Sequence, residues 1–282
     1  MNTHAVTYSP SWRILTSAFL VIGRLAPLVL FALLLFSPEP PANPLRLLRL
    51  FSILCLAPAL VAWVLTRVFE VRLSVGGGSV VIEQRKRRIE IPCDAITAVD
   101  PWAVPLPGAG VWLRLPSGRR FQYGIQLDDP RSLIQAVADG GVAPNVRESA
   151  DSPALAYARA KHAIGDWRWY HYLFRYVFFA LVPALPLFRV HQWIAYGGTF
   201  GEYYQYGLKA YVSGFAVYWA TLIVYLVLWA ALWRAAAEII AYCAASVAPS
   251  LAARVRRTVE VVHRVLYYGG VPVLLALRFV EW

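Results

Sequence analysis

The sequence has few charged residues and very few cysteines. Only 15% of its 282 residues are Asp, Glu, Lys or Arg, whereas an ordinary soluble domain carries about 25%. Cys55, Cys93 and Cys243 are far apart and form no CxxC pair, so no disulfide framework or zinc site is indicated. There is no GxSxG, HExxH or Walker A motif, and no GxGxxG in its proper context. The sequence therefore offers no catalytic residue, and we expect no cofactor.

Apolar and aromatic residues are abundant instead. Hydrophobic residues make up 59% of the chain, the mean hydropathy is +0.52, and there are 11 Trp and 16 Tyr. Trp and Tyr favour the boundary between a bilayer and water. An apolar run of about 20 residues is long enough to cross a bilayer. The sequence predicts an α-helical integral membrane protein with about five transmembrane helices, at residues 14–36, 47–68, 171–187, 211–233 and 259–279.

Residues 71–142 differ from the apolar runs around them because charges and glycines appear there. Apolar residues alternate with a period of two, which is typical of strands. This alternation occurs at 71–75, 89–91, 111–115 and 121–125, and the stretch that ends at Asp100 is interpreted as helix-prone. Asp128 or Asp129 then caps a short helix in which Pro130 suits the first turn. We expect an inserted small β domain, a barrel or sandwich, with one closing helix.

These patterns divide the chain into four parts. Residues 1–70 form a transmembrane helical hairpin, residues 71–142 the β domain, residues 143–160 a linker and the start of a helix, and residues 161–282 a three-span membrane domain. In this last part Pro183 and Pro186 are expected to kink the end of the third span. The helix of the fourth span is expected to continue to residue 247, shortly before Pro249.

The distribution of cations predicts the orientation. With five spans and a cytoplasmic amino terminus, 21 of the 27 Lys and Arg residues lie on the inside. Cations that flank spans favour the cytoplasmic side. We therefore expect a bacterial inner-membrane protein with a cytoplasmic amino terminus and β domain and a periplasmic carboxyl terminus.

A family resemblance rests on three stretches of the β domain. These are VRLSVGGGSVVIEQRKRRIEIPCDAITAV, GVWLRLPSGRRFQYGI and DDPRSLIQAV, with an I-P-x-x-x-I-x-x-V turn at Ile91, Pro92, Ile96 and Val99. About residues 71–138 resemble the bacterial pleckstrin-homology-like (PH-like) domains that are attached to membrane hairpins. The Pro- and Gly-rich insertion at residues 101–110 departs from that pattern. The resemblance implies a binding or assembly module and brings no catalytic residue with it.

Two basic turns are the clearest electrostatic feature of the β domain. A cation near an anionic leaflet is worth about 1 kcal/mol, and the attraction decays within a Debye length. The turns are candidates for binding anionic phospholipids or an acidic partner, and the alternative is a solvated turn that keeps the domain soluble. Their residues are Arg85, Lys86, Arg87 and Arg88 in the first turn and Arg119 and Arg120 in the second.

Polar residues within the expected spans are the next candidates. Arg24 lies about ten residues into the first span and either snorkels to the headgroups, meets a structural partner or binds an anion. Backbone carbonyls or a lipid phosphate are the partners that we expect for it. His171 and His263 fall near the inner ends of two spans and are the residues that could hold a haem. A hydrogen-bonded role at the interface is the commoner one for such histidines, so no metal site is expected.

Residues 191–210 form a polar and aromatic stretch on the expected outer side. Its candidates for interfacial contact are Trp193, Tyr203, Tyr204 and Tyr206. These rings either dock another membrane subunit or belong to a short helix at headgroup level.

The sequence thus favours a non-enzymatic inner-membrane scaffold or regulatory subunit. Its β domain would contact anionic lipid or a partner subunit, and a membrane protein partner or a homo-oligomer is expected. A component of a lipid or amphiphile transport system is the alternative, and a membrane-embedded enzyme is the third interpretation. The chain contains no zinc-finger spacing and no RNA-binding aromatic signature, so its net charge of +11 is not taken to indicate a nucleic-acid partner.

Overall fold

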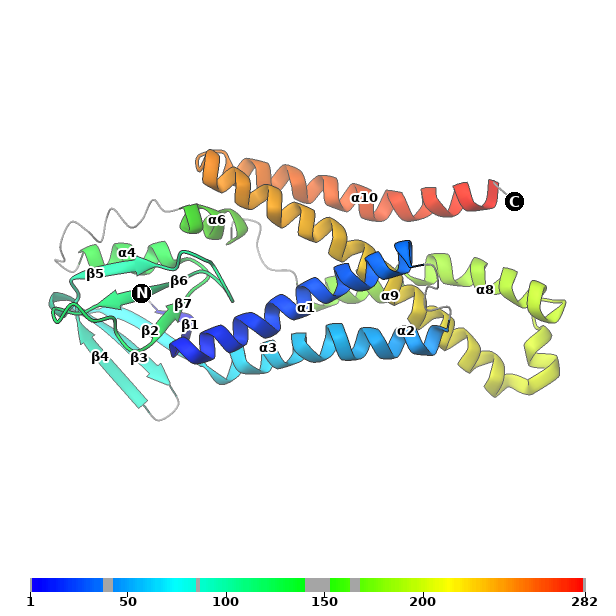
Figure 1. The fold of residues 1–282 in the computed structure, drawn as a ribbon, viewed down its shortest axis with the longest axis horizontal. Coiled ribbons are helices and arrows are strands. Elements are labelled where there is room, and N and C mark those ends of the chain that lie inside the picture. Colours follow the sequence, from blue (N-terminus) through cyan, green and yellow to red (C-terminus); the bar gives the residue numbers. More distant parts are fainter. Residues whose placement is uncertain (1, 38–42, 85–86, 140–152, 163–167, 281–282) are drawn as a thin grey trace. The chain divides into compact units, whose positions relative to one another are not determined.

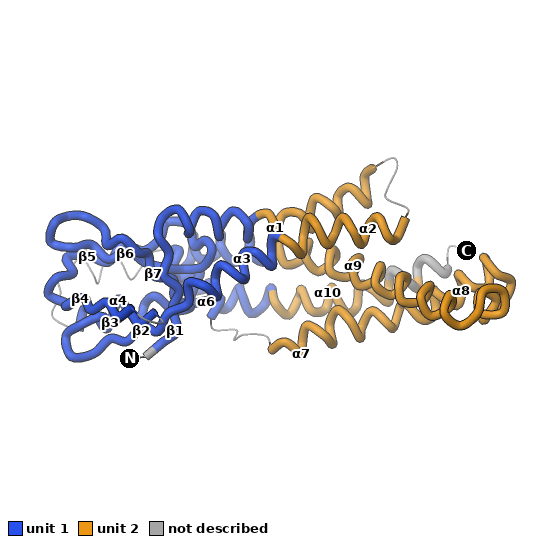
Figure 2. The backbone as a smooth tube through the Cα atoms, turned by 90° about the horizontal axis from the view of Figure 1, so that it is seen from below, with its two compact units in different colours: residues 1–21, 58–165, 237–259 blue, residues 22–57, 166–236, 260–282 orange. Residues whose placement is uncertain are grey.

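The computed structural model describes residues 2–37, 43–84, 87–139, 153–162 and 168–280. They belong to two compact units (Figure 2). One unit contains residues 1–21, 58–165 and 237–259, and the other contains residues 22–57, 166–236 and 260–282. The first unit carries a β-sheet, and the described part of the second is helical (Figure 1).

The sheet is a curled half-barrel of seven antiparallel strands. Neighbouring strands follow the order β4-β3-β2-β1-β7-β6-β5 (Figure 1). The strands are β1 (Asn2–Tyr8), β2 (Glu70–Gly76), β3 (Ser79–Gln84), β4 (Arg87–Pro92), β5 (Ala98–Pro101), β6 (Gly110–Arg114) and β7 (Gly124–Gln126). The expectation of an inserted β domain in a helical chain is therefore confirmed.

One face of the sheet packs on α4 (Pro130–Asp139). The carboxylate of Asp129 accepts a hydrogen bond from the backbone N–H of Arg131, at 3.1 Å, so this helix begins with the expected cap. The shared core contains Val71, Leu73 and Val75 of β2 and Leu133, Ile134 and Val137 of α4. The alternation in the sequence thus marks the buried face, and the closing helix is confirmed.

The middle of the sheet contains a strand that the sequence analysis assigned to the membrane hairpin. β1 lies between β2 and β7, and it pairs with β2 from Asn2↔Ser74 to Val6↔Glu70. Ala5 is 3% exposed and belongs to the core. The boundary expected at residue 71 leaves this strand out, although its alternating residues (NTHAVTY) carry the same signal as the later strands.

Two other segments of the sheet differ in detail from the sequence pattern. The stretch that was interpreted as helix-prone contains one short 3₁₀ turn, η2 (Cys93–Ala95), and then strand β5. Of the alternating stretch at 121–125, only the part from Gly124 onward forms a strand, the three-residue β7. The apolar positions of the I-P-x-x-x-I-x-x-V turn nevertheless join the core, since Ile91, Ile96 and Val99 are 5%, 1% and 0% exposed.

The first unit also contains α6 (Pro153–His162) and the two helix ends around the turn at Pro249. Small residues of α6 pack on α9 (Gly201–Val247) and α10 (Ala252–Val280), in a cluster of Ala156, Ala160, Ala245 and Ala252. Arg256 is 1% exposed and donates two hydrogen bonds of 2.7 Å to the carboxylate of Glu238, which also accepts from the hydroxyl of Tyr157. This bidentate pair connects α9 to α10.

The amino-terminal helices form the expected hairpin. α1 covers Pro10–Phe36, and the returning helix covers Pro44–Val68 as α2 (Pro44–Phe51), a π-helical segment η1 (Ser52–Leu56) and α3 (Ala57–Val68). Asn43 caps α2, with its side-chain oxygen accepting from the backbone N–H of Leu45 at 2.9 Å. In the second unit, Leu30 of α1 and Leu47 of α2 are buried against Val224 of α9.

The third helical region is longer than expected. It consists of α7 (Trp169–Tyr172), a π-helical segment η4 (Leu173–Phe178) and α8 (Leu181–Tyr196). Pro183 lies in the first turn of α8 and Pro186 lies inside it, so the helix continues ten residues past the second proline. The interruption falls before both prolines, between Phe178 and Leu181.

α9 confirms the long fourth helix, which runs to Val247 as the pattern predicted. Gly207 has φ 83° and ψ 173°, a conformation that favours glycine, and it separates a first short helical piece from the long one. The piece before Gly207 contains the aromatic run that the sequence placed in a short interfacial helix.

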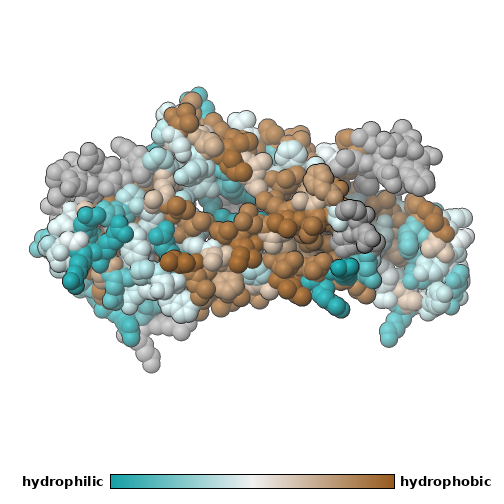
Figure 3. Space-filling model, viewed as in Figure 1, coloured by the Kyte–Doolittle hydropathy of each residue, from teal (hydrophilic) through white to brown (hydrophobic). Residues whose placement is uncertain are grey.

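Four helical regions within the described residues are long and apolar enough to cross a membrane. They are Pro10–Phe36, Pro44–Val68, Trp169–Tyr196 and Gly201–Val247. Hydrophobic side chains gather over α1 and α3 on the face shown in Figure 3, and hydrophilic ones over the sheet. α10 forms a helix where the fifth span was expected.

Candidate functional site

The directions of the strands bring the first basic turn to the end of the sheet at which the helices begin. β1 ends and β2 begins at the same end, since the two are antiparallel neighbours. β3 runs parallel to β1, so the first basic turn, which follows β3, lies at that end too. We call it the helix end of the sheet, because α1 follows β1 after Ser9 and α3 precedes β2 by Phe69. The second basic turn follows the end of β6, whereas the start of β6 is the part that is level with the end of β1.

The first basic turn is described in part. Arg85 and Lys86 lie outside the described residues, and Arg87 and Arg88 are exposed at the start of β4. Arg88 lies opposite Glu83 across the strand pair, with a guanidinium–carboxylate distance of 4.0 Å, and is 3.6 Å from the carboxylate of Glu90. These pairs are exposed and therefore contribute little, about 0–1 kcal/mol each.

The second basic turn follows β6. Arg119 is exposed, and its backbone N–H donates to the hydroxyl of Ser117 at 3.4 Å. The guanidinium of Arg120 is 3.8 Å from the carboxylate of Asp100, which also accepts a 2.6 Å hydrogen bond from Arg114. Asp100 thus balances part of the charge of this turn.

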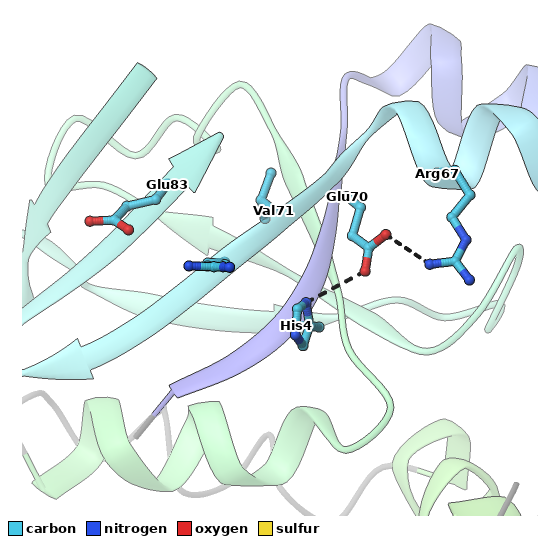
Figure 4. Close-up of a pocket in the computed structure, with 6 residues that line it drawn as sticks. His4, Arg67, Glu70, Val71 and Glu83 are labelled. Atoms are coloured by element: carbon cyan, nitrogen blue, oxygen red, sulfur yellow. Dashed lines mark hydrogen bonds and ion pairs between the residues drawn. The ribbon is translucent and has the colours of Figure 1, made fainter. Parts of the chain in front are cut away.

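A polar groove opens at the helix end on the face of the sheet opposite α4. It has a volume of about 490 Å³ and is lined by His4, Arg67, Glu70, Val71, Arg72 and Glu83 (Figure 4). Side chains alternate between the two faces along β1, β2 and β3. The register places His4 opposite Arg72 and Arg72 opposite Glu83, so these three polar residues share the face of the groove. Arg67 belongs to the last turn of α3. We call the site the headgroup-level groove, after the membrane position that we propose for it.

Charges of both signs line this groove. The carboxylate of Glu70 accepts a 3.1 Å hydrogen bond from Arg67 and lies 3.5 Å from Nδ1 of His4 (Figure 4). Arg72 is exposed between His4 and Glu83, and no ion pair joins it to another residue in the described ranges. A ligand that carries a phosphate and a cation would find partners for both.

An arginine of α1 holds the loop that departs from the PH-like pattern. The Arg13 guanidinium stacks over the Trp102 ring at 3.9 Å and donates to the carbonyls of Val104 at 3.0 Å and Leu106 at 3.1 Å. Sequence analysis noted the loop at residues 101–110 but missed Arg13. Arg13 is about 90 residues from this loop in the sequence, so no local pattern indicated the contact.

Arg24 and the outer aromatics lie in the second unit. Arg24 is exposed on α1 and makes no hydrogen bond or ion pair with any residue that the structure describes. Trp193 is 57% exposed and donates from its indole nitrogen to the hydroxyl of Thr199 at 3.0 Å. The exposed fractions of Tyr203, Tyr204 and Tyr206 are 43%, 79% and 67%.

The two histidines have different surroundings. His171 is exposed, and its Nδ1 accepts a 3.1 Å hydrogen bond from the backbone N–H of Arg168. His263 is 4% exposed, and its Nε2 is 2.8 Å from the guanidinium of Arg175. A guanidinium only donates, so Nε2 of His263 accepts and its proton lies on Nδ1. Within the described ranges, no group of three or more His, Cys, Asp or Glu residues is suited to a metal ion.

A buried polar cluster between η4, α9 and α10 was missed. Arg175, Glu260 and His263 are each 4% exposed, and the Glu260 carboxylate accepts a 3.2 Å hydrogen bond from Arg234. The hydroxyl of Tyr267 donates to the backbone carbonyl of Arg175 at 2.9 Å. The sequence signal was Glu260, the second residue of the expected fifth span, with His263 three residues later on the same helical face.

Comparison with protein-family models, curated proteins and solved structures finds no match to this chain.

Proposed function

We propose that this chain is a non-enzymatic scaffold or regulatory subunit of the bacterial inner membrane. Five helices anchor a PH-like β domain at the cytoplasmic face, and the domain contacts anionic phospholipid or a neighbouring subunit there. The observation that carries the proposal is the connection of the helical hairpin to the centre of the sheet. One residue separates β1 from α1, and one residue separates α3 from β2.

These short connections favour a β domain that is held in a fixed position relative to the two helices of the hairpin. β1 and β2 are paired strands, so a hairpin that leaves the sheet through α1 must return to the same side through α3. The hydroxyl of Tyr8 donates to the hydroxyl oxygen of Thr66 at 3.2 Å, and Phe69 packs 5.3 Å from Trp12, ring centre to ring centre. Side-chain contacts therefore reinforce the two short junctions.

The location of the first basic turn supports contact with anionic lipid. It lies at the helix end of the sheet, where the candidate spans begin and end. A Debye length at physiological ionic strength is about 8 Å, so cations attract a leaflet only when they are held this close to it. The four cations of this turn, at about 1 kcal/mol each, would provide a useful contribution to orientation.

Hydrogen exchange of the full-length protein in nanodiscs tests the lipid contact. The isolated segment 71–142 is unsuitable, because it lacks central strand β1. We expect the peptide that covers residues 79–92 to be protected in anionic nanodiscs compared with neutral ones, and the protection to disappear when Arg85, Lys86, Arg87 and Arg88 are replaced with Ser. Arg46→Ser combined with Arg49→Ser, at the far end of the hairpin, is the matched control. Equal exchange in both lipids would contradict the lipid contact.

Purification in mild detergent tests the scaffold role. We expect a stoichiometric membrane protein partner, or a second copy of this chain, in cross-linked and native mass spectra. A protein that remains monomeric and unaccompanied after cross-linking in native membranes would contradict a scaffold. If a tag placed after residue 282 is accessible only from the cytoplasm, the fifth helix does not cross the membrane.

A further inference from the structure

We propose that the headgroup-level groove binds the head group of an ethanolamine phospholipid of the inner leaflet. Its cations would hold the phosphate and its carboxylates the ammonium group. This inference rests on the membrane placement in the proposed function, but it concerns a different surface from the basic turns and a zwitterionic ligand.

Exposed tryptophans at the helix end support a headgroup-level position. Trp12 in the first turn of α1 is 43% exposed, and Trp63, near the end of α3, is 57% exposed. Such rings are enriched at the level of the lipid headgroups. Arg67 lies one helical turn beyond Trp63, with its guanidinium 5.8 Å from the ring. Glu70 begins β2 three residues later. The edge of the groove therefore lies where a phosphate would be.

The charges of the groove select between headgroups. Arg67 and Arg72 are permanent cations of a kind that binds phosphate through two parallel N–H donors. Glu70 and Glu83 are on the same surface and offset the charge of the two arginines, so a ligand with only negative charge gains less than one that also carries a cation. A primary ammonium can donate three hydrogen bonds to these carboxylates. The methyl groups of choline cannot donate any, so ethanolamine is the better occupant.

The shape of the groove is consistent with an occupant of this size. Its volume of about 490 Å³ lies in the range of about 300–1,000 Å³ that is usual for small-molecule sites. A second hollow of about 440 Å³ adjoins it and shares His4, Arg72 and Glu83. The groove is open along the sheet, as a site that receives a headgroup from an adjacent leaflet must be.

Competitive lipid retention by the full-length protein tests this inference. The protein is purified into micelles that contain equal amounts of ethanolamine, choline and glycerol phospholipids with the same acyl chains, and retained lipids are counted by native mass spectrometry. We expect ethanolamine lipid to be preferred over choline lipid. Glu83→Gln should lower that preference by about two- to fivefold, the weight of one exposed ion pair. Arg72→Gln should lower retention of both lipids by a similar factor.

Matched variants make the result specific. Glu90→Gln removes the same charge from β4 outside the groove, and Arg159→Gln removes a cation from α6, so both should retain lipids like the unmodified chain. Soluble phosphoethanolamine in excess should displace the ethanolamine lipid, and inorganic phosphate should not. Equal retention of ethanolamine and choline lipids, a preference that Glu83→Gln leaves unchanged, or a retention of both lipids that Arg72→Gln leaves unchanged would overturn the inference. Protection of residues 79–92 in anionic nanodiscs would then still stand, because it does not depend on this groove.

Discussion

Replacing Arg13 with Ala is expected to release the loop between β5 and β6 from the first turn of α1. The guanidinium makes three contacts with this loop: a stack on Trp102 at 3.9 Å and hydrogen bonds to the carbonyls of Val104 and Leu106. A charged donor to a carbonyl is worth about 1.5–3 kcal/mol, and a cation–π contact about 0.5–2 kcal/mol. Arg13 is half-buried, and the three contacts share one side chain, so their sum is discounted to about 2–4 kcal/mol.

This free energy corresponds to a rise of about 30- to 1,000-fold in the opening of the loop, at tenfold per 1.4 kcal/mol. Hydrogen exchange by mass spectrometry measures it directly. The reporters are the backbone amides of Trp102 and Leu106, which donate 2.8 Å hydrogen bonds to the carbonyls of Gly110 and Val104. The helices should keep their own protection, because the change is local.

Two comparisons make the test specific. Arg13→Lys keeps the charge but lacks the planar fork that spans both carbonyls, so its exchange should be intermediate. Arg24→Ala removes an exposed arginine from the same helix and should leave the loop unchanged. If Arg13→Ala exchanges in the loop like the unmodified chain, the contacts of Arg13 do not hold the loop, and the reasoning is refuted.

Three further predictions follow from burial. Ala5→Asp places a charge in the core of the sheet and should cost more than about 3 kcal/mol in proteolytic stability of the β domain, whereas His4→Ser on the exposed face of the same strand should be nearly neutral. Glu260→Gln should lower the melting temperature in detergent, because it removes the ion pair with Arg234. That pair is worth about 1–3 kcal/mol after allowance for the half-exposed guanidinium. An unchanged melting temperature would contradict a stabilising role for the pair. Burial and the adjacent Asp94 carboxylate raise the pKa of the Cys93 thiol, so maleimide should label exposed Cys243 first at pH 8, and equal rates would argue against a buried Cys93.

Local patterns in the sequence were sufficient for most of the elements. Period-two alternation located β2, β4 and β6, and the Asp-Asp-Pro signal located α4. The continuation of α9 to Val247 followed from an uninterrupted helical pattern before Pro249. These features depend on nearest neighbours along the chain, which a single sequence contains.

Long-range pairing was beyond the sequence patterns. The strand in NTHAVTY has the right alternation, but its partners begin more than 60 residues later, beyond both helices of the hairpin. The groove depends on the register between β1, β2 and β3, which brings His4, Arg72 and Glu83 into one row. The buried cluster depends on η4, α9 and α10 together, and without their packing Glu260 reads as an ordinary flanking charge.

Arg24 bears on the proposed partner within the membrane. It lies 14 residues after the start of α1 and 12 before its end, so it is near the middle of the span if α1 crosses the membrane as proposed. An arginine at mid-membrane costs at least about 2.5–3.5 kcal/mol, yet this one is exposed in the single chain. A second subunit that covers this face would lower that cost. Arg24→Leu should therefore weaken co-purification of the partner or of a second copy, while Leu33→Ala, at an exposed apolar position farther along α1, should not. Equal recovery of the partner with Arg24→Leu would place Arg24 against lipid instead.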